Sequence, residues 1–143
     1  MEAEKRIYSL FSNVTSVLGY SEVHGRILAA LLVSKKSLSL DQISKKIGYS
    51  ISSISLSLDF LEIMDVIKRI KKPNDKKLYV QIQGDLLDCL RKIVLFKTKK
   101  NVENTLEEFE KYKSQGNSTV NALEKELKRL KRYIELLSKV KIP

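Results

Sequence analysis

Six cations within ten residues form the segment best suited to binding a polyanion. Lysine or arginine fills six of the ten positions from Lys68 to Lys77, and the single acid among them is Asp75. Ammonium and guanidinium groups at this density attract phosphates. The six are Lys68, Arg69, Lys71, Lys72, Lys76 and Lys77. Strand alternation sends about half of them to each face, so about three or four can reach phosphates together. The other interpretation is a charged strand edge that resists pairing with further strands.

A helix expected from Ser50 to about Met64 offers a second kind of chemistry. Ile54, Leu58 and Leu61 recur at helical spacing and predict its buried side, with Ile51 as a fourth candidate. The residues left for the outer face are Ser52, Ser53, Ser55, Leu56 and Asp59. Serine hydroxyls can bond base edges or phosphates, and a leucine can pack on a thymine methyl. Because this face has no Arg, Asn or Gln, bidentate base reading is absent and we expect modest specificity.

Other reactive side chains do not form a recognisable site. His24 has no Cys or His partner at ligand spacing, so we expect no metal. Cys89 is interpreted as a small core or interface residue, with a redox sensor as the alternative. The serine runs lack a base-plus-acid arrangement, and the five glycines form no phosphate loop. We therefore expect neither an enzyme nor a bound cofactor.

Composition sets the limits for these residues. A chain of 143 residues suits one domain, or a small domain with an appendage. The net charge of +10 points to a polyanionic partner, or to a lysine-rich surface tuned for solubility. The charges are segregated: residues 66–100 hold eleven cations and three Asp, whereas residues 101–110 hold four Glu and no cation. That placement favours the polyanion. One cysteine and no apolar run of membrane-spanning length lead us to expect a soluble cytoplasmic protein without membrane contact.

The pattern along the chain predicts the elements that position these residues. Amphipathic or apolar helices are expected over 3–18 and around 27–33, and a capping box at Ser39 and Gln42 opens a helix over 40–47 that Gly48 ends. Strands are expected over 66–70 and 78–82, joined by Pro73, Asn74 and Asp75. A long helix follows Asp85, a loop covers 114–118, and a last helix carries apolar residues in steps of three and four.

Two short helices followed by a basic hairpin are typical of a winged helix-turn-helix. We therefore predict a mainly α fold with a small β-hairpin wing and long terminal dimerisation helices. The predicted parts are an N-terminal dimerisation helix (1–20), a winged helix-turn-helix DNA-binding domain (21–83) and a C-terminal helical hairpin for dimerisation (84–143). The last helix could instead pack only on its own chain, but a two-helix hairpin buries little alone. The predicted dimer interface is Ile7, Leu10, Phe11, Leu123, Leu127, Leu130, Ile134 and Leu137.

Residues 25–82 resemble the MarR superfamily, most closely its GbsR-like branch of archaea and bacteria. The resemblance rests on Gly25-Arg26 before an aliphatic helix, on Leu38-Ser39-Leu40-Asp41 opening the next helix, and on the serine-rich helix and basic wing that follow. The archaeal TrmB-like regulators are the nearest competitor. Asp59 and the lysines at 76 and 77 depart from the family pattern, where basic or neutral residues and arginine are commoner.

The resemblance implies a dimeric DNA-binding transcriptional regulator. Carried onto this chain, it puts Ser50, Ile51, Ser52, Ser53, Ser55 and Leu56 on the DNA-facing part of the recognition helix. It also places Asp75 and Lys77 in the wing. Lys45 and Lys46 either add backbone contacts or are solvated. Such regulators often bind a small effector, and a cleft lined by Phe11, Tyr20 and Leu90 is the predicted place.

The sequence is compatible with three functions. The first is a homodimeric regulator on a pseudo-palindromic duplex, with its two recognition helices in major grooves about 34 Å apart. The second is a low-specificity architectural DNA-binding protein. The third is a protein-interaction winged helix of the transcription machinery, which the uncharged recognition helix keeps open.

Overall fold

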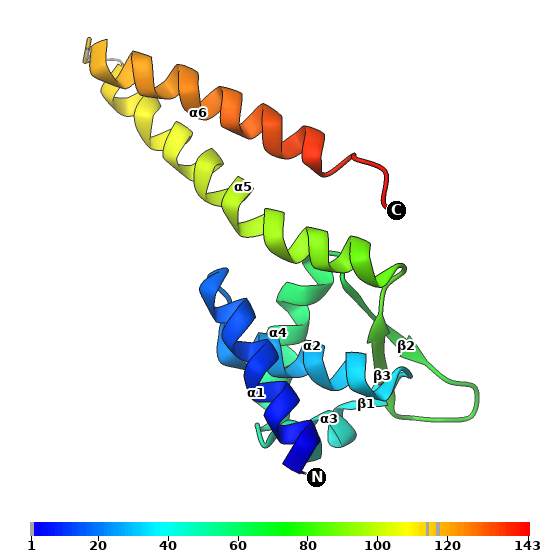
Figure 1. Cartoon of the computed structure of the whole chain (residues 1–143). Helices are drawn as coiled ribbons and strands as arrows, with labels where there is room; N and C mark the ends of the chain where they lie inside the picture. Colours follow the sequence, from blue (N-terminus) through cyan, green and yellow to red (C-terminus); the bar gives the residue numbers. More distant parts are fainter. Residues whose placement is uncertain (1, 114, 117) are drawn as a thin grey trace. The chain divides into compact units, whose positions relative to one another are not determined.

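The computed structural model describes residues 2–113, 115–116 and 118–143 (Figure 1). The elements are α1 (Glu2–Val17), α2 (Glu22–Ser34), β1 (Leu38–Ser39), α3 (Leu40–Ile47), α4 (Ile51–Ile63), β2 (Ile67–Lys71), β3 (Leu78–Ile82), α5 (Leu86–Lys113) and α6 (Ser118–Leu137). The chain divides into two compact units, Met1–Ile93 and Val94–Pro143. Helix α5 passes from one unit into the other. Within the described residues, no helix has both the length and the apolar character needed to cross a membrane.

Local side-chain chemistry sets the ends of the helices in the first unit. Ser21 and Ser39 each cap a helix and close a capping box, with His24 and Gln42 as their respective partners. Gly48 adopts a left-handed φ of 78° and ends α3, as predicted, because glycine carries no Cβ to oppose that conformation. Ser50 then caps α4 by accepting a hydrogen bond from the Ser53 amide at 3.2 Å. The turn between α3 and α4 follows from these caps.

Helices α2, α3 and α4 and the sheet surround one apolar core. Helix α2 is buried almost all round from Ile27 to Leu31, as its unbroken apolar run predicted. The predicted inward positions of α4, Ile54, Leu58 and Leu61, are fully buried, together with Ser57, which was not predicted. Ile51, the fourth candidate, is exposed.

The sheet is antiparallel and has the order β1-β3-β2. The predicted hairpin forms with Arg69 opposite Val80, and its first strand begins one residue later than expected. Strand β1 was not predicted. Its two residues pair Leu38 with Val80 and Ser39 with Tyr79, a segment too short to show any alternation in the sequence. The mainly α fold with a small β wing, a winged helix-turn-helix with long terminal helices, is confirmed.

Helix α1 contacts α2 through a face that its apolar pattern did not indicate. Its buried residues are Tyr8, Ser12 and Thr15. Ser12 and Thr15 are small enough to let α1 lie directly against Gly25 of α2, and the Ser12 hydroxyl donates to the Glu22 carbonyl at 3.2 Å. The predicted apolar stripe therefore points elsewhere: Ile7, Leu10 and Val14 are exposed, and Phe11 and Leu18 are half-buried.

The second unit is an antiparallel pair made of the later part of α5 and α6. Ion pairs Lys113–Glu124 at 3.0 Å and Lys99–Glu135 at 4.0 Å bridge the two helices near their two ends. Val102, Val120 and Ile134 are buried between them. Helix α5 ends at Lys113 and α6 begins at Ser118, so the last residue of the loop predicted over 114–118 belongs to α6; Gly116 has a φ of 75°. Ser114 and Asn117 of that loop lie outside the described residues.

Candidate nucleic-acid interface

The serine-rich face of α4 is open to solvent. Ser52, Ser53 and Leu56 are exposed, and Leu56 keeps 73% of its surface accessible. Ser55 is half-buried. Side chains this short allow the helix axis to approach another surface closely, and hydroxyl groups supply donors and acceptors without a fixed charge. The face can therefore lie in a groove of a polar polymer, but it provides no fork-shaped donor such as Arg, Asn or Gln.

The hairpin presents its lysines at one end of the sheet. The loop between β2 and β3 projects from the first unit (Figure 1). Lys68, on β2, and the loop lysines Lys76 and Lys77 are exposed. Lys71 and Lys72 are also exposed, and each makes a contact within the hairpin. Lys71, Lys72, Lys76 and Lys77 thus surround one projecting turn, and Lys68 lies farther back, near the start of β2 and opposite Gln81.

A hydrogen-bonded frame gives this turn a defined shape. Pro73 precedes Asn74, whose φ is 60°, and the Asp75 amide donates to the Lys72 carbonyl at 3.1 Å, the pattern of a type II turn. The Asp75 carboxylate accepts from the Lys77 amide at 2.9 Å and from the Tyr79 hydroxyl at 2.8 Å. These bonds lower the pKa of Asp75, the backbone bond most, so the group is ionised at neutral pH.

The wing residues predicted to contact DNA therefore differ in what they do inside the wing. Asp75 holds the turn together, and its negative charge opposes direct contact with phosphate. The Lys72 ammonium lies 3.9 Å from the centre of the Tyr79 ring, and the Lys71 ammonium donates to the Lys76 carbonyl at 2.9 Å. The wing is thus a preformed loop, with its ammonium groups displayed around it.

Arg69 is placed differently from the lysines. Its guanidinium points toward α4, where it donates to the Asp59 carboxylate at 2.6 Å and to the Ser55 carbonyl at 3.1 Å. Lys45 and Lys46 lie in the last turn of α3, where cations are favoured by the helix dipole. Lys45 is exposed and Lys46 is half-buried. Among the predicted cations, Arg69 thus bonds the α4 helix of its own domain.

The first turns of α5 are anchored to this unit near the base of the wing. Asp85 caps the helix by accepting from the Asp88 amide at 3.1 Å, as predicted. The buried Cys89 thiol donates to the Gln83 carbonyl at 3.0 Å, and burial raises the pKa of that thiol. A raised pKa keeps the group protonated and unreactive, in line with the predicted core role. The Lys92 ammonium bonds the Asp65 carbonyl at 3.2 Å, where Asp65 has a left-handed φ of 62°.

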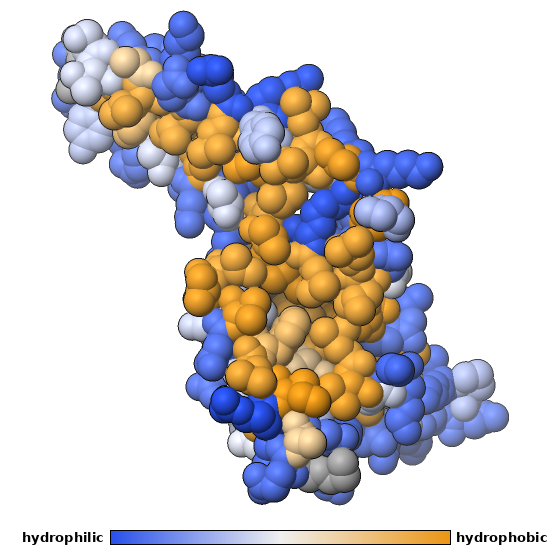
Figure 2. Space-filling model, in the orientation of Figure 1, coloured by the Kyte–Doolittle hydropathy of each residue, from blue (hydrophilic) through white to orange (hydrophobic). Residues whose placement is uncertain are grey.

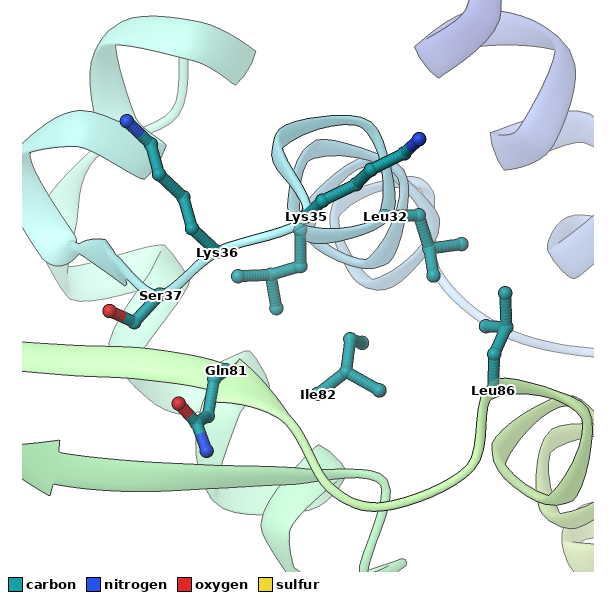
Figure 3. Close-up of a pocket in the computed structure, with 8 residues that line it drawn as sticks. Leu32, Lys35, Lys36, Ser37, Gln81, Ile82 and Leu86 are labelled. Atoms are coloured by element: carbon teal, nitrogen blue, oxygen red, sulfur yellow. The ribbon is translucent and has the colours of Figure 1, made fainter.

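The effector cleft predicted around Tyr20 and a hollow near the wing differ in how open they are to a small ligand. Tyr20, predicted to line an effector cleft, is buried, and its hydroxyl donates to the Ile93 carbonyl at 2.6 Å. An open hollow of about 350 Å³ lies instead at the root of the wing. Figure 3 shows Leu32, Ile82 and Leu86 pointing into it, while the ammonium ends of Lys35 and Lys36 point away. The hollow is therefore lined by aliphatic side chains together with the polar residues Ser37 and Gln81.

His24 has a structural environment. It completes the capping box of α2, and its ring lies 5.0 Å from the Phe60 ring, centre to centre. In the described part of the chain, no group of three or more His, Cys, Asp or Glu residues is arranged to hold a metal ion.

The residues predicted for dimerisation fall into exposed and buried sets. Figure 2 shows apolar side chains gathered on the viewed face over α1. On α6, Leu123 and Leu130 are 51% and 41% exposed, whereas Ile134 is 3% exposed. Leu127 and Leu137 are half-buried. Residues 120, 127 and 134 form one column at seven-residue spacing that faces α5, and residues 123, 130 and 137 form a second column beside it that is more open.

The comparisons with known proteins identify the fold. No protein-family model and no curated protein matches this chain. Among solved structures, a crystal structure described as that of a transcriptional regulator superposes with a TM-score of 0.68 and 14% sequence identity. The match covers 96% of this chain and 97% of the other. At this identity the likeness establishes a shared fold, and it extends over the terminal helices as well as the winged centre.

Proposed function

We propose that this protein is a homodimeric transcriptional regulator that binds double-stranded DNA without catalytic activity. The observation that carries the proposal is the exposed, short-chained face of α4 beside a projecting wing ringed by lysines. The match to a solved structure described as a transcriptional regulator supports it. Membership of the MarR superfamily, GbsR-like branch, is part of the proposal and rests on the motifs in residues 25–82. An effector remains a prediction without an assigned site.

In this proposal α4 enters the major groove. Ser52, Ser53 and Ser55 bond base edges or phosphates, and Leu56 packs on a thymine methyl. Ser50 and Ile51, at the start of the helix, complete the contact. Because none of these side chains forms a bidentate bond to a base, sequence preference is modest and most of the binding free energy is electrostatic.

The wing supplies that electrostatic part. The lysines of the wing lie on the phosphates flanking the groove, with Lys45 and Lys46 as further candidates. If two subunits neutralise about six to eight phosphates, log affinity falls with log salt concentration at a slope of roughly −5 to −7. The turn framed by Asp75 and Tyr79 keeps the ammonium groups in place before DNA arrives, which lowers the entropy lost on binding.

Dimerisation follows from two unpartnered apolar faces, each within its own unit. On α1, Ile7, Leu10, Val14 and Val17 are exposed at helical spacing. On α6, the column of residues 120, 127 and 134 is the apolar column that packs inside the hairpin. The neighbouring column of Leu123, Leu130 and Leu137 is available to a second copy. We propose 1–20 and 84–143 as the dimerisation segments and 21–83 as the DNA-binding segment, so that the dimer presents two α4 helices to a pseudo-palindromic site.

The test is selection of bound duplexes from a random pool at two salt concentrations, followed by salt titrations on the selected duplex. The double substitution Lys76→Gln/Lys77→Gln removes about four phosphate contacts per dimer, so the slope should become shallower by about 3 to 4. Lys139→Gln/Lys141→Gln is the matched control, because it removes the same charge from exposed residues far along the sequence from the wing. The control should change the slope by less than about 1.

Two alternatives are outcomes of the same experiment. The absence of Arg, Asn and Gln from the exposed face of α4 favours an architectural DNA-binding protein, which predicts enrichment without a shared motif. A regulator should instead prefer its selected site over random duplex by about a thousandfold or more at fixed salt. The exposed Leu56 and Ile63 favour a protein-interaction module, which predicts no duplex binding near physiological salt.

A further inference from the structure

Arg69 joins the wing to the recognition helix. It lies in β2, opposite Val80 of β3, and one nitrogen of its guanidinium bonds two points on α4. The carbonyl of Ser55 and the carboxylate of Asp59 are four residues apart, so they lie one above the other on the same side of the helix. The guanidinium group therefore fixes which side of α4 faces the sheet and how far α4 is shifted along its own axis.

Arg69 and its neighbour in β2 differ in how much of each side chain is exposed to solvent. The Arg69 side chain is 23% exposed, and its Nε is buried without a hydrogen-bond partner among the described residues. Lys68, its neighbour in β2, is exposed. Because successive residues of a strand point to opposite faces, the two cations cannot serve the same surface. The position of Arg69 suits the planar, rigid guanidinium, whereas an ammonium would hold one point at a time.

Asp59 gains a role from the same contact. It is an acid on the outward face of α4, and its side chain is 59% exposed. An unpaired carboxylate there would repel DNA phosphates, yet the Arg69 guanidinium lies 2.6 Å away and compensates its charge. The ion pair thus removes a repulsive charge from the recognition face while it fixes the angle between that face and the wing.

We infer that Asp59 and Arg69 are a positioning pair that sets the recognition helix against the wing, and that Arg69 does not bind phosphate. The inference rests on the proposed DNA-binding function and deepens it. It reassigns Arg69 from the predicted phosphate contacts, and it gives a function to Asp59, which departs from the family pattern. A dimer whose α4 and wing are held at one angle can fit groove and backbone at the same time; without the pair, the two contacts compete.

The experiment compares salt titrations of the selected duplex for Arg69→Gln, Asp59→Asn, the double variant and Lys68→Gln. A positioning pair predicts that each single variant weakens binding about tenfold, that the double variant is no weaker than either, and that all three keep the wild-type salt slope. Lys68→Gln should instead make the slope shallower by about 2, because two phosphate contacts per dimer are lost. Arg69→Gln with a slope change like that of Lys68→Gln would overturn the inference, as would tighter binding by Asp59→Asn.

A matched control exists within the chain. Glu22 and Arg26 form an ion pair at 2.8 Å with the same side-chain exposures, 23% for the arginine and 59% for the acid, but on α2 alone. Glu22→Gln and Arg26→Gln should leave DNA affinity unchanged within about twofold, since a pair within one helix sets no angle between elements.

Failure of the inference and failure of the proposed function give different results. If wild-type protein binds no duplex, the proposed function is wrong, and the pair is then tested by thermal unfolding of the same variants. A pair that joins β2 to α4 predicts lower Tm for both single variants and no further loss in the double variant. Additive losses, with or without DNA binding, would show that Asp59 and Arg69 act independently.

Discussion

Gly25 shows how one residue decides where a helix can lie. A Cβ at this position would come within 2.3 Å of the Thr15 hydroxyl and 2.7 Å of the Ser12 Cα. Real Cβ atoms do not approach backbone atoms so closely, and the Ser12 Cα cannot move without moving α1. The glycine that carried the family resemblance is therefore required by the packing of α1 against α2, whatever its part in the motif.

Gly25→Ala should destabilise the protein by about 1–3 kcal/mol, because the added methyl overpacks a tight helix contact. The sign of the change in the free energy of unfolding distinguishes a tight helix contact from an exposed helix position. In an exposed helix interior the same substitution would stabilise by roughly 1 kcal/mol through helix propensity. Chemical denaturation of the full chain measures the difference, and a more stable variant would contradict the close approach of the two helices.

Lys68 and Arg69 show what residue type alone leaves open. Both are cations in one basic run, and the sequence offered no reason to separate them. The separation comes from the strand, which turns Lys68 outward and Arg69 toward Asp59, ten residues earlier in the chain. The density of positive charge could be predicted from the sequence; the partner of each cation could not.

Among the elements, α6 contains a buried acid in addition to its apolar stripe. Next to the buried column, on the side away from Leu123, lies Glu124, which is buried and accepts from the Lys113 and Lys128 ammonium groups, each at 3.0 Å. Lys113 belongs to α5 and Lys128 to α6 itself. The two hydrogen bonds, that of Lys128 foremost, lower the pKa of Glu124, so the carboxylate is ionised and links the two helices at neutral pH.

Glu124→Gln should weaken the helical pair at neutral pH and remove part of its acid sensitivity. Because the pKa of Glu124 is lowered on folding, its stabilising contribution is complete above its ordinary value of 4.5 and is lost as pH falls through the folded value. In thermal unfolding, the variant should therefore have a lower Tm than the wild type at pH 7. The difference between the two Tm values should become smaller below pH 4.5. Glu126→Gln, on an exposed residue, is the control, and a gap that stays constant with pH would refute the assignment.

Strand β1 is an element that only the assembled sheet reveals. Leu38 and Ser39 lie between a connector and a helix cap, and Ser39 serves both the sheet and the capping box of α3. Two residues cannot show a period of two. The strand exists because β3 offers an edge with free backbone groups, which is a property of the hairpin rather than of Leu38 and Ser39.

For the whole molecule, the decisive question is how many copies act together. Val14 of α1 is 59% exposed and Leu130 of α6 is 41% exposed, and each belongs to an apolar face that the described residues of its own unit leave open. Regular apolar faces of this kind are uncommon on monomers and are typical of association surfaces.

Val14→Lys and Leu130→Lys should each shift the protein from dimer to monomer and leave its helical content unchanged. A lysine in an apolar seam loses burial and carries an unpaired charge, so we expect dimer dissociation to rise about tenfold or more, measured by sedimentation. Leu136→Lys is the control, because Leu136 is similarly exposed but lies beside the cations of α6, among Lys125, Arg129 and Arg132. A wild-type protein that sediments as a monomer at high concentration would exclude the proposed dimer.

Much of the fold could be predicted because it depends on neighbours in the chain. Helix caps at Ser39 and Ser50, the turn at Pro73 and Asn74, and the alternation of the hairpin are governed by hydrogen bonds and dihedral preferences within a few residues. The serine face of α4 and the lysines of the wing follow from the same periodicities. Features of this kind can be read from the chain alone, because the groups that cause them are close together in it.

Which surfaces pack together is known from the folded structure alone. It assigned the small face of α1 to α2 and left the apolar stripe of α1 outside, it divided the α6 stripe into a covered and an open column, and it paired Arg69 with Asp59. These choices depend on shape and charge contributed by residues far apart in the chain. The periodicity of the sequence distinguishes the two faces of a helix, but it does not determine which face packs against a neighbouring element.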